Sequence, residues 1–469
     1  MIFKLLLALF LPILSGFLLV NLFWRDKSSV FSDFLLKLSL SVGSGIGLSS
    51  CLYYILLMFF NDFIRSFIFV ESVLAVFLSV LLVYKVHKEN LNINLFFSSF
   101  KYRIYQIPLF LTFLASSILA IAFFLINSIN NPYGNWDGWA IWNMRARFIF
   151  RGGESFINTF SNLIDWSHPD YPILLPAFIA RCWNFVGSET QIIPILIQLL
   201  FTFFTVLLLF SSLSLLRSKV QGLLSGMILL SSLLFIAEGV TQCADIPISF
   251  FFLATIVLFY LQDRFVSEKY NFLLLAGIMS GLAIWTKNEG FLFLICLITA
   301  RLLVYIPGKG HRKVLQELMW YTLGLMPVLL IVIYFKLQVA PANDIFSSLT
   351  YQSIVDKLLD FSRYAQLTDI FKHKILEFSQ GIVSPLLIIA YSIVIGIKIE
   401  KEDRLNILFS FLLFIFMLIG YTFIYIITPY NLSWHAETSL HRLILQLWPT
   451  FIFIYMMVIT YPEYYFKKE

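Results

Sequence analysis

The sequence predicts an all-α, polytopic transmembrane bundle, and its composition and its long apolar runs both indicate this class. Of its 469 residues, 59% are hydrophobic and 13% are charged, with a mean hydropathy of +0.86. Because a soluble domain carries about 25% charged residues, this composition is that of an integral membrane protein. The formal charge of +6 comes mostly from short loops and does not indicate a nucleic-acid partner.

Apolar runs near the length of about 20 residues that crosses a bilayer predict about thirteen spans. We expect them at residues 2–23, 38–60, 64–84, 108–127, 190–216, 220–238, 246–262, 271–286, 290–306, 317–337, 380–398, 405–427 and 440–460. The first run is long for a signal peptide and lacks a convincing cleavage site, so we interpret it as a retained span.

The runs also suggest two domains. We expect an N-terminal three-helix membrane anchor at 1–104 and a catalytic membrane core at 105–469. The core includes two long outer loops, 128–189 and 338–379. In the first loop, segments 136–150 and 172–186 are expected to be interfacial helices on the outer membrane surface. The tryptophans of the first suit the headgroup layer, whereas the second is short, contains Arg181 and as a span would reverse the side of every later loop.

Positive charge predicts the orientation, because cytoplasmic loops carry an excess of lysine and arginine. With thirteen spans, the following basic residues all fall on one side: Arg25, Lys27, Lys85, Lys88, Lys101, Arg103, Arg217, Lys219, Arg264, Lys269, Lys309, Arg312, Lys313, Lys398, Lys401, Arg404, Lys467 and Lys468. The N-terminus is therefore expected outside and the C-terminus in the cytoplasm, and a bacterial inner (plasma) membrane fits best.

Unusual polar residues gather in four loops on the expected outer side. Ionisable residues at membrane depth are costly and usually line a functional cavity. The candidates for substrate binding or catalysis are Trp136, Asp137, Arg145, Arg147, His168, Asp170, Asp245, Lys287, Glu289, His441 and Arg442.

Asp137 is the sharpest of these candidates. It lies between Trp136 and Trp139, and a carboxylate in a partly dry, aromatic pocket can act as a general base on a hydroxyl. An equally good interpretation makes it the N-cap of the following helix. Arg145 and Arg147 on that helix are suited to binding phosphate, or to lying among lipid headgroups.

The other candidates also have structural alternatives. His168 and Asp170 flank Pro169 in a rigid turn that either presents them to a ligand or only begins the next helix. Asp245 suits a helix cap, and Lys287 beside Glu289 suits a neutralising ion pair. Arg442 lacks a nearby acid other than Glu437, so either a ligand phosphate or snorkelling accounts for it.

Several function classes lack their motifs. The sequence contains no Walker loop, GxGxxG, GxSxG or HExxH, which argues against an ATP-driven pump and a soluble nucleotide-sugar enzyme. The four cysteines show no metal-binding spacing, and a disulfide between Cys182 and Cys243 stays open. No metal ligand and no certain cofactor follow from the sequence, and a divalent metal is left open.

Five motifs occur in an order that resembles the C-type superfamily of membrane glycosyltransferases, in the branch of protein O-mannosyltransferases and lipid A aminoarabinose transferases. They are WDGW from Trp136, HPDYPILLP from His168, the Asp-x-Pro at Asp245, GLAIWTKNEG from Gly281 and HRLILQLWP from His441. The resemblance covers roughly residues 105–460. Two features depart from the family, namely the three preceding helices and the glycine, rather than a second acid, after Asp137.

The resemblance implies an inverting glycosyltransferase of the cell envelope that modifies lipopolysaccharide or another glycan. Its donor would be a polyprenyl-phosphate-linked sugar, and its acceptor a hydroxyl or amine of a lipid, glycan or protein, bound among membrane lipids. Asp137 would deprotonate the acceptor, with Asp245 as the second catalytic candidate. Arg442, Lys287 or the first-loop arginines would stabilise the departing phosphate.

Two other classes compete with this interpretation. An O-antigen-type glycan polymerase also has many spans and large outer loops with arginines, but needs no Asp-x-Pro or GLAxxxK element. A lipid-linked glycan transporter would favour inverted repeats and charged residues in mid-helix, which the sequence lacks.

Overall fold

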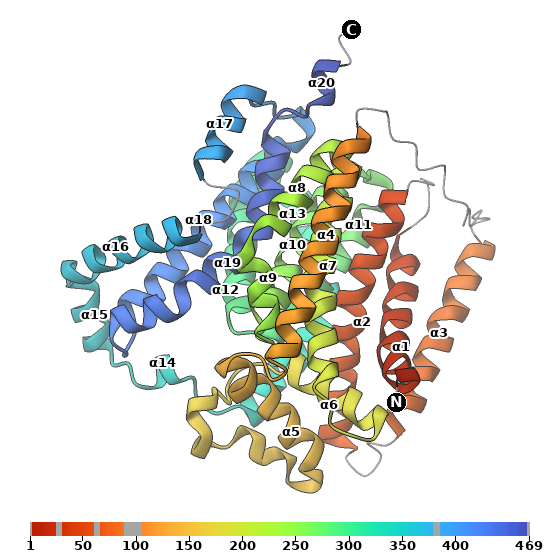
Figure 1. Ribbon diagram of the computed structural model, residues 1–469, viewed down its shortest axis with the longest axis vertical. Coiled ribbons are helices and arrows are strands. Elements are labelled where there is room, and N and C mark those ends of the chain that lie inside the picture. The colour runs from red at the N-terminus through yellow and green to blue at the C-terminus, as the bar shows by residue number, and fades with distance from the viewer. Residues whose placement is uncertain (1, 25–30, 61–65, 89–105, 379–384, 467–469) are drawn as a thin grey trace.

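The computed structural model describes residues 2–24, 31–60, 66–88, 106–378 and 385–466, and these form a bundle of helices (Figure 1). No strand occurs in these ranges, and one isolated bridge joins Ile397 to Ile459. The predicted all-α polytopic bundle is therefore confirmed. Lipid-exposed backbone favours this architecture, because a helix satisfies its own backbone hydrogen bonds.

Ten described helices are long and apolar enough to cross a membrane. They are α1 (Ile2–Phe23), α2 (Phe31–Phe59), α3 (Phe67–Lys88), α4 (Ile107–Asn130), α7 (Ile192–Leu216), α10 (Asp245–Arg264), α12 (Glu289–Lys309), α13 (His311–Tyr334), α18 (Arg404–Ile427) and α19 (Leu432–Val458). The helices α8 (Lys219–Ser231) and α9 (Leu233–Val240) are bent by 62° and count as an eleventh span if taken together.

The remaining differences from thirteen spans lie at two helices. α11 (Lys269–Thr286) begins with the polar residues Lys269 to Asn271, which shorten its apolar length. α17 (Pro385–Ile395) has 11 residues, and the first five residues of the predicted span at 380–398 lie outside the described ranges. The structure thus supports a polytopic bundle without fixing the number of spans at thirteen.

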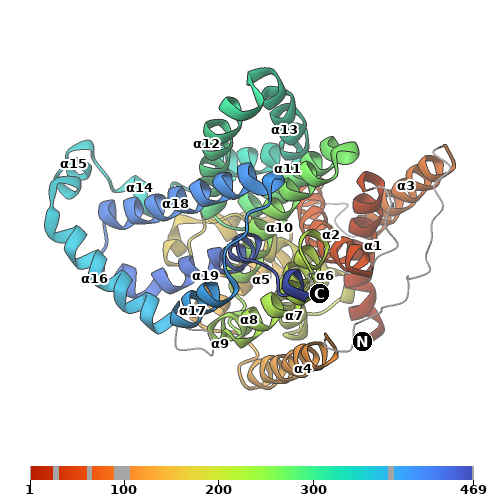
Figure 2. The same cartoon turned by 90° about the horizontal axis from the view of Figure 1, so that it is seen from above.

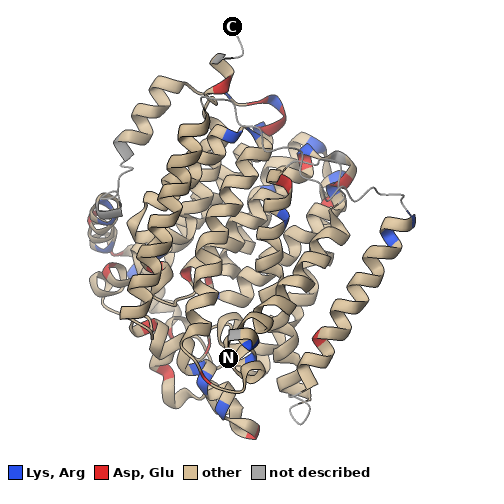
Figure 3. Ribbon diagram, turned by 45° about the vertical axis from the view of Figure 1, so that its right-hand side comes forward, with Lys and Arg blue, Asp and Glu red and all other residues tan. Residues whose placement is uncertain are grey.

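The described chain ends lie at opposite ends of the bundle (Figure 1). The N-terminal end also holds the first long loop, which forms η3 (Gly138–Asn143), α5 (Met144–Arg151), η4 (Gly153–Phe160), η5 (Asn162–Ser167) and α6 (Leu174–Val186). Figure 3 shows that charged residues gather mainly toward the two ends. We call the end with this loop the loop end. The basic residues 25, 27, 101, 103, 467 and 468 used for orientation lie outside the described ranges.

α10 lies at the centre of the bundle, and α3 and α4 lie at its edge (Figure 2). After η7 (Phe335–Val339), the second long loop forms α14 (Asp344–Ser347), α15 (Tyr351–Leu359) and α16 (Phe361–Phe378), which project to one side (Figure 2). Three short helices complete the described structure: η6 (Val266–Glu268), η8 (Lys401–Asp403) and α20 (Glu463–Phe466).

α6 is buried inside the protein rather than exposed along one face. Eleven of its residues are buried, and its arginine, Arg181, forms an ion pair with Glu71 of α3. The expectation of a helix on the membrane surface rested partly on this arginine, which a spanning segment tolerates poorly. The structure neutralises the charge through Glu71 and thereby lets the helix pack inside the protein.

The predicted N-terminal anchor is joined to the rest of the bundle by polar contacts as well as by packing. The Ser50 hydroxyl of α2 donates to the Leu174 carbonyl at 2.9 Å and accepts from Trp285 Nε1 at 3.1 Å. These bonds link α2 to both α6 and α11. α2 is therefore an internal helix against which the helices of the loop end pack.

Candidate active site

The segment that carries Asp137 is held against the turn between α9 and α10. Asn135 N–H donates to the Thr241 carbonyl at 3.2 Å, and Asn143 Nδ2 donates to Gln242 Oε1 at 2.6 Å. A Cβ on Gly138 would lie 2.1 Å from the Thr241 carbonyl oxygen, so only glycine permits this approach. The close contact fixes where the first residue of η3 and its neighbours lie.

Asp137 occupies the N-cap position of η3, but its side chain makes no capping hydrogen bond. Asn135 Oδ1 accepts from Gly138 N–H at 2.8 Å instead. The capping alternative therefore does not account for the Asp137 carboxylate. That carboxylate forms an ion pair with Arg442, a residue 305 positions away in α19.

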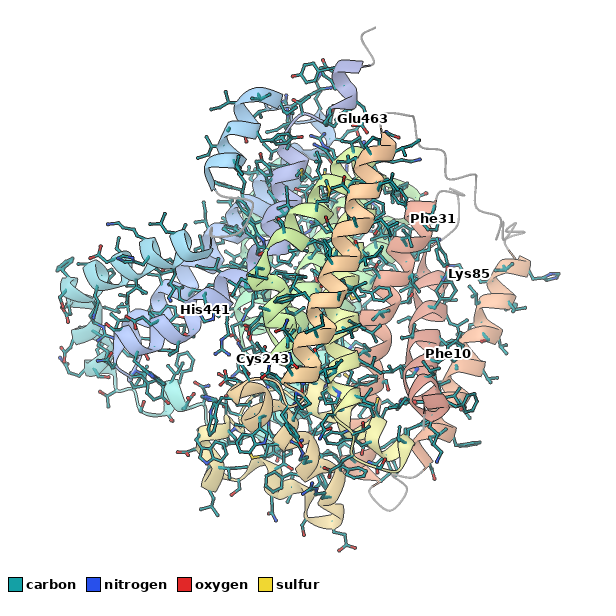
Figure 4. All side chains as sticks on the ribbon, in the orientation of Figure 1. Phe10, Phe31, Lys85, Cys243, His441 and Glu463 are labelled. Atoms are coloured by element: carbon teal, nitrogen blue, oxygen red, sulfur yellow. The ribbon has the colours of Figure 1, made fainter. Side chains whose placement is uncertain are left out.

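Arg442 belongs to an acid–base cluster, which we define as Asp137, Glu238, Asp245, Lys287, Glu289, Arg442 and Gln446. Lys287 Nζ lies 3.0 Å from Asp245 Oδ1 and 2.8 Å from Glu289 Oε1. Gln446 Nε2 donates to Asp245 at 2.7 Å and to Glu289 at 3.3 Å. Cys243 and His441, labelled in Figure 4, mark two of the chain segments that contribute to this cluster.

The acid–base cluster contains more carboxyl groups than cationic groups. Four carboxylates surround the two cations Arg442 and Lys287. Burial alone would lower the pKa of Lys287, but the carboxylates of Asp245 and Glu289 outweigh it and hold that pKa above its ordinary value. The Nε of Arg442 is buried and has no hydrogen-bond partner within the described ranges, so the guanidinium retains a donor for a ligand.

Three side chains in and beside this cluster are close enough together to be considered as ligands of one metal ion. Atoms of Glu238, Cys243 and Asp245 all lie within 4.8 Å of one another. Lys287 Nζ already donates to Asp245, however. The positive charge of this ammonium group opposes the binding of a metal cation to the same carboxylate. The geometry therefore gives no support to a metal here. All four cysteines are free, so Cys182 and Cys243 form no disulfide.

His168 and Asp170 lie in a neighbouring group. We define the Asp170 cluster as Asp170, Asn288, Lys336 and Asn343. Asp170 Oδ2 accepts from Asn288 at 2.9 Å and from Asn343 at 2.8 Å, and Lys336 Nζ lies 3.7 Å away. These bonds tie the first long loop to the second and to the turn before α12, which gives Asp170 a structural environment.

His168 continues this connection between the loops. It adopts a left-handed backbone conformation with φ of 50° and its Nδ1 lies 3.3 Å from Asp344 Oδ2. Tyr430 O–H donates to the same oxygen at 2.9 Å. Burial opposes ionisation of Asp344, but hydrogen bonds and charge from His168, together with Tyr430, outweigh it and lower the pKa of Asp344.

The two candidate arginines of α5 diverge. Arg145 is fully buried, and its Nη1 donates to the Tyr171 carbonyl at 2.7 Å. Burial lowers the pKa of Arg145 to about 10, which leaves it charged at neutral pH. Arg147 instead lies near Glu189, with 3.6 Å between Nε and Oε2. Among the described residues, neither arginine forms a hydrogen bond or ion pair with Asp137.

Five predicted residues thus meet in one cluster: Asp137, Asp245, Lys287, Glu289 and Arg442. Trp136 is exposed and its ring lies 5.4 Å from that of Trp139. His441 precedes Arg442 and is partly buried. The sequence prediction missed Gln446, although its position four residues after Arg442 places both side chains on one face of α19. It also missed Lys336 and Asn343, which no motif marks.

Comparison with known proteins supplies one match. A family model described as dolichyl-phosphate-mannose-protein mannosyltransferase matches residues 167–335, a little over a third of the chain. The matched region includes Asp170, Asp245 and Lys287 but neither Asp137 nor Arg442. Neither the curated proteins nor the solved structures gave a match. The family match, together with the apolar helices, supports the resemblance found in the motifs and indicates a membrane glycosyltransferase of the C type.

Proposed function

We propose that this protein is an inverting glycosyltransferase that moves a sugar from a polyprenyl-phosphate donor to an acceptor hydroxyl or amine. The observation that carries the proposal is the contact between Asp137 of the first long loop and Arg442 of the last long helix. A proton acceptor and a phosphate-binding cation thereby lie side by side. These are the two groups that displacement of a phosphate from a sugar needs.

The reaction is a direct displacement at the anomeric carbon. Asp137 takes the proton of the acceptor, whose oxygen or nitrogen forms a bond to that carbon on the face opposite the phosphate. The bond from carbon to phosphate oxygen breaks, and its electron pair leaves with the polyprenyl phosphate. Inversion follows because one displacement occurs, and no nucleotide is required because the donor already carries an activated leaving group.

Because Asp137 is paired with Arg442, binding of the donor phosphate directly affects the proposed base. A donor phosphate competes with Asp137 for Arg442, whose buried Nε has no partner within the described residues. Once the phosphate engages the guanidinium, the Asp137 carboxylate is released from the ion pair. It is then free to take the proton of the acceptor. The base is thus made available when the donor is bound.

Asp245, Lys287 and Gln446 hold the other side of this arrangement. Lys287 lies between Asp245 and Glu289, so its ammonium group has a fixed position from which to meet a second phosphate oxygen. Gln446 lies one helical turn after Arg442 in α19. Its side chain donates to Asp245, and this hydrogen bond orients the side chains of Gln446 and Asp245. Asp245 then acts through Lys287 and Gln446 as a positioning residue.

The site would lie at the extracytoplasmic surface of a bacterial inner membrane. Basic residues such as Arg217, Arg264 and Lys309 lie at helix ends away from the first long loop, which favours a cytoplasmic position for them. The acid–base cluster lies at the loop end, where a lipid-linked sugar could enter from the bilayer. The acceptor would be a lipid, glycan or protein on that side.

The test uses purified protein in nanodiscs with a panel of radiolabelled polyprenyl-phosphate sugars and an acceptor extract from the same membranes. We expect transfer by the wild type and a loss of at least about 100-fold for Asp137→Asn, since a general base contributes about 10²–10⁴. The stereochemistry of the product, read by NMR, should be inverted at the anomeric carbon.

Glu154→Gln is the matched control, because Glu154 is an exposed acid in the same loop. It should transfer as the wild type does. Equal transfer by Asp137→Asn and Glu154→Gln would remove Asp137 from catalysis. A retained anomeric configuration would rule out the single displacement.

A further inference from the structure

A cavity of about 420 Å³ lies among η3, α5 and the connection between α6 and α7. This volume is in the range of about 300–1,000 Å³ that binds small molecules. Its lining includes Tyr133, Trp139, Arg147, Trp183, Glu189 and Gln191. Nothing in the proposed displacement uses these residues, so the cavity needs its own explanation.

The polar side of the cavity carries an excess of positive charge. Arg151 donates to both carboxylate oxygens of Glu189, one contact measuring 2.7 Å, and so takes up most of that negative charge. Arg147 lies only within 3.6 Å of Glu189 and makes no hydrogen bond among the described residues. Its guanidinium is fixed near the rings of Tyr133 and Trp183, each 5.8 Å away.

Burial of Arg147 acts in the same sense as its incomplete pairing. It lowers the pKa of Arg147 even though Glu189 acts in the opposite direction. A partly buried arginine with free donors, held between two rings, is arranged for a planar or tetrahedral anion. The cavity thus offers one anionic subsite at a defined position.

The rest of the lining suits a sugar ring, which has hydroxyl groups at its edge and apolar faces. Gln191 Nε2 donates to the Tyr133 hydroxyl at 2.8 Å, which leaves the amide oxygen and phenol available as further partners. Trp139 is 43% exposed and presents an indole surface to the cavity. Aromatic rings and amides match a sugar better than an alkyl chain, for which an aliphatic lining would be expected.

The cavity is connected in the sequence to the proposed base. Trp139 follows Asp137 by two residues in the segment fixed against Thr241. Its ring lies 5.4 Å from that of Trp136, which in turn lies 6.3 Å from that of Trp166. These three exposed indoles form an aromatic surface that begins at the cavity with Trp139.

We propose that this cavity binds the acceptor, and that the acceptor is a glycan carrying an acidic group. Arg147 contacts the carboxylate or phosphate of the glycan, and Trp139 stacks on a sugar ring. The remainder of the glycan follows the exposed indoles to bring its reacting hydroxyl to Asp137. The inference rests on the proposed transferase function and assigns Arg147 to the acceptor rather than to the lipid phosphate of the donor.

The test measures binding separately from transfer. Protein in phosphatidylcholine nanodiscs is titrated with digalacturonic acid and with its neutral methyl ester, and binding is followed by saturation-transfer NMR. The wild type should bind the acid at least about 10-fold more tightly than the ester. Arg147→Gln should abolish this difference, whereas Trp139→Ala should weaken both sugars and Trp139→Phe should restore part of the binding.

Arg312→Gln is the control, since Arg312 is an exposed arginine in the first turn of α13. Equal binding of acid and ester to the wild type, or unchanged binding by Arg147→Gln, would overturn the proposal. So would loss of sugar binding when phosphatidylglycerol replaces phosphatidylcholine, because the cavity would then hold a lipid headgroup.

Kinetics with the native acceptor separate this inference from the transferase proposal. Arg147→Gln should raise the KM for the acceptor about 10-fold and leave the KM for the donor unchanged. Transfer with an unchanged acceptor KM would reject the acceptor site and retain the transferase. Acid-selective binding without transfer from any donor would reject the transferase and retain a glycan site.

Discussion

The acid–base cluster and the Asp170 cluster both join distant segments at the loop end, but they differ in how far their polar groups are satisfied. Asp170 is 2% exposed and accepts from two amides beside Lys336. In the acid–base cluster, carboxylates outnumber cations and Arg442 retains an unpartnered Nε. A satisfied buried network stabilises one structure, whereas an unbalanced, partly exposed one can still gain from a ligand.

This difference suggests separate roles for residues that the sequence could not distinguish. Asp137 and Asp170 are both acids of the first long loop. Asp137 is paired with Arg442, to which a phosphate can bind. Asp170 is held by amide partners that a ligand would have to displace. We therefore expect substitutions in the first cluster to alter chemistry and those in the second to alter stability.

The largest effect is expected from Arg442→Gln. Removing a charged donor from the departing phosphate should lower turnover by about 10²–10³, as loss of an oxyanion-hole donor does. Arg442→Lys should recover part of this loss. Radiolabel transfer at saturating donor checks the prediction, with Arg404→Gln, an exposed arginine at the start of α18, as the control. Turnover within twofold of the wild type would place the phosphate elsewhere.

A second prediction concerns Asp170→Ala. It leaves the part-buried amides of Asn288 and Asn343 without their carboxylate acceptor and removes a negative charge beside Lys336. The free energy of unfolding should therefore fall by about 3 kcal/mol. Unfolding in detergent, followed by circular dichroism, measures this. Asp165→Ala, at an exposed acid nearby, should change stability little. Should Asp170→Ala unfold as the wild type does but lose transfer, Asp170 would belong with the reacting groups.

Gly138→Ala is expected to have the smallest effect of the three. The added Cβ would meet the Thr241 carbonyl oxygen at 2.1 Å, so the segment carrying Asp137 must move away from α10. Turnover should fall about 10-fold, since small misplacements of a catalytic group are costly. Gly308→Ala adds a Cβ only 3.3 Å from a flexible leucine side chain and should be nearly silent. Full activity of Gly138→Ala would show that Asp137 need not be held there.

Several parts of the fold and site could be predicted from sequence because they depend on local pattern. The apolar runs marked the spanning helices, and the ordered motifs pointed to Asp137, Asp245, Lys287 and Arg442. The count of spans could not be settled in this way, because α11 begins with polar residues and α8 and α9 are bent at Ser232. The buried position of α6 was also unpredicted, since Glu71, which neutralises Arg181, lies in another helix.

The sequence by itself determined the class of the protein and the list of polar residues that needed explanation, because hydrophobicity and charge act along the chain. Only the tertiary structure decided which of them meet. Arg145 and Arg147 are two positions apart, so their side chains point about 200° apart around a helix, one toward Tyr171 and the other into the cavity. Asp137 and Arg442 meet across 305 positions because helix packing and the Gly138 contact bring their segments together.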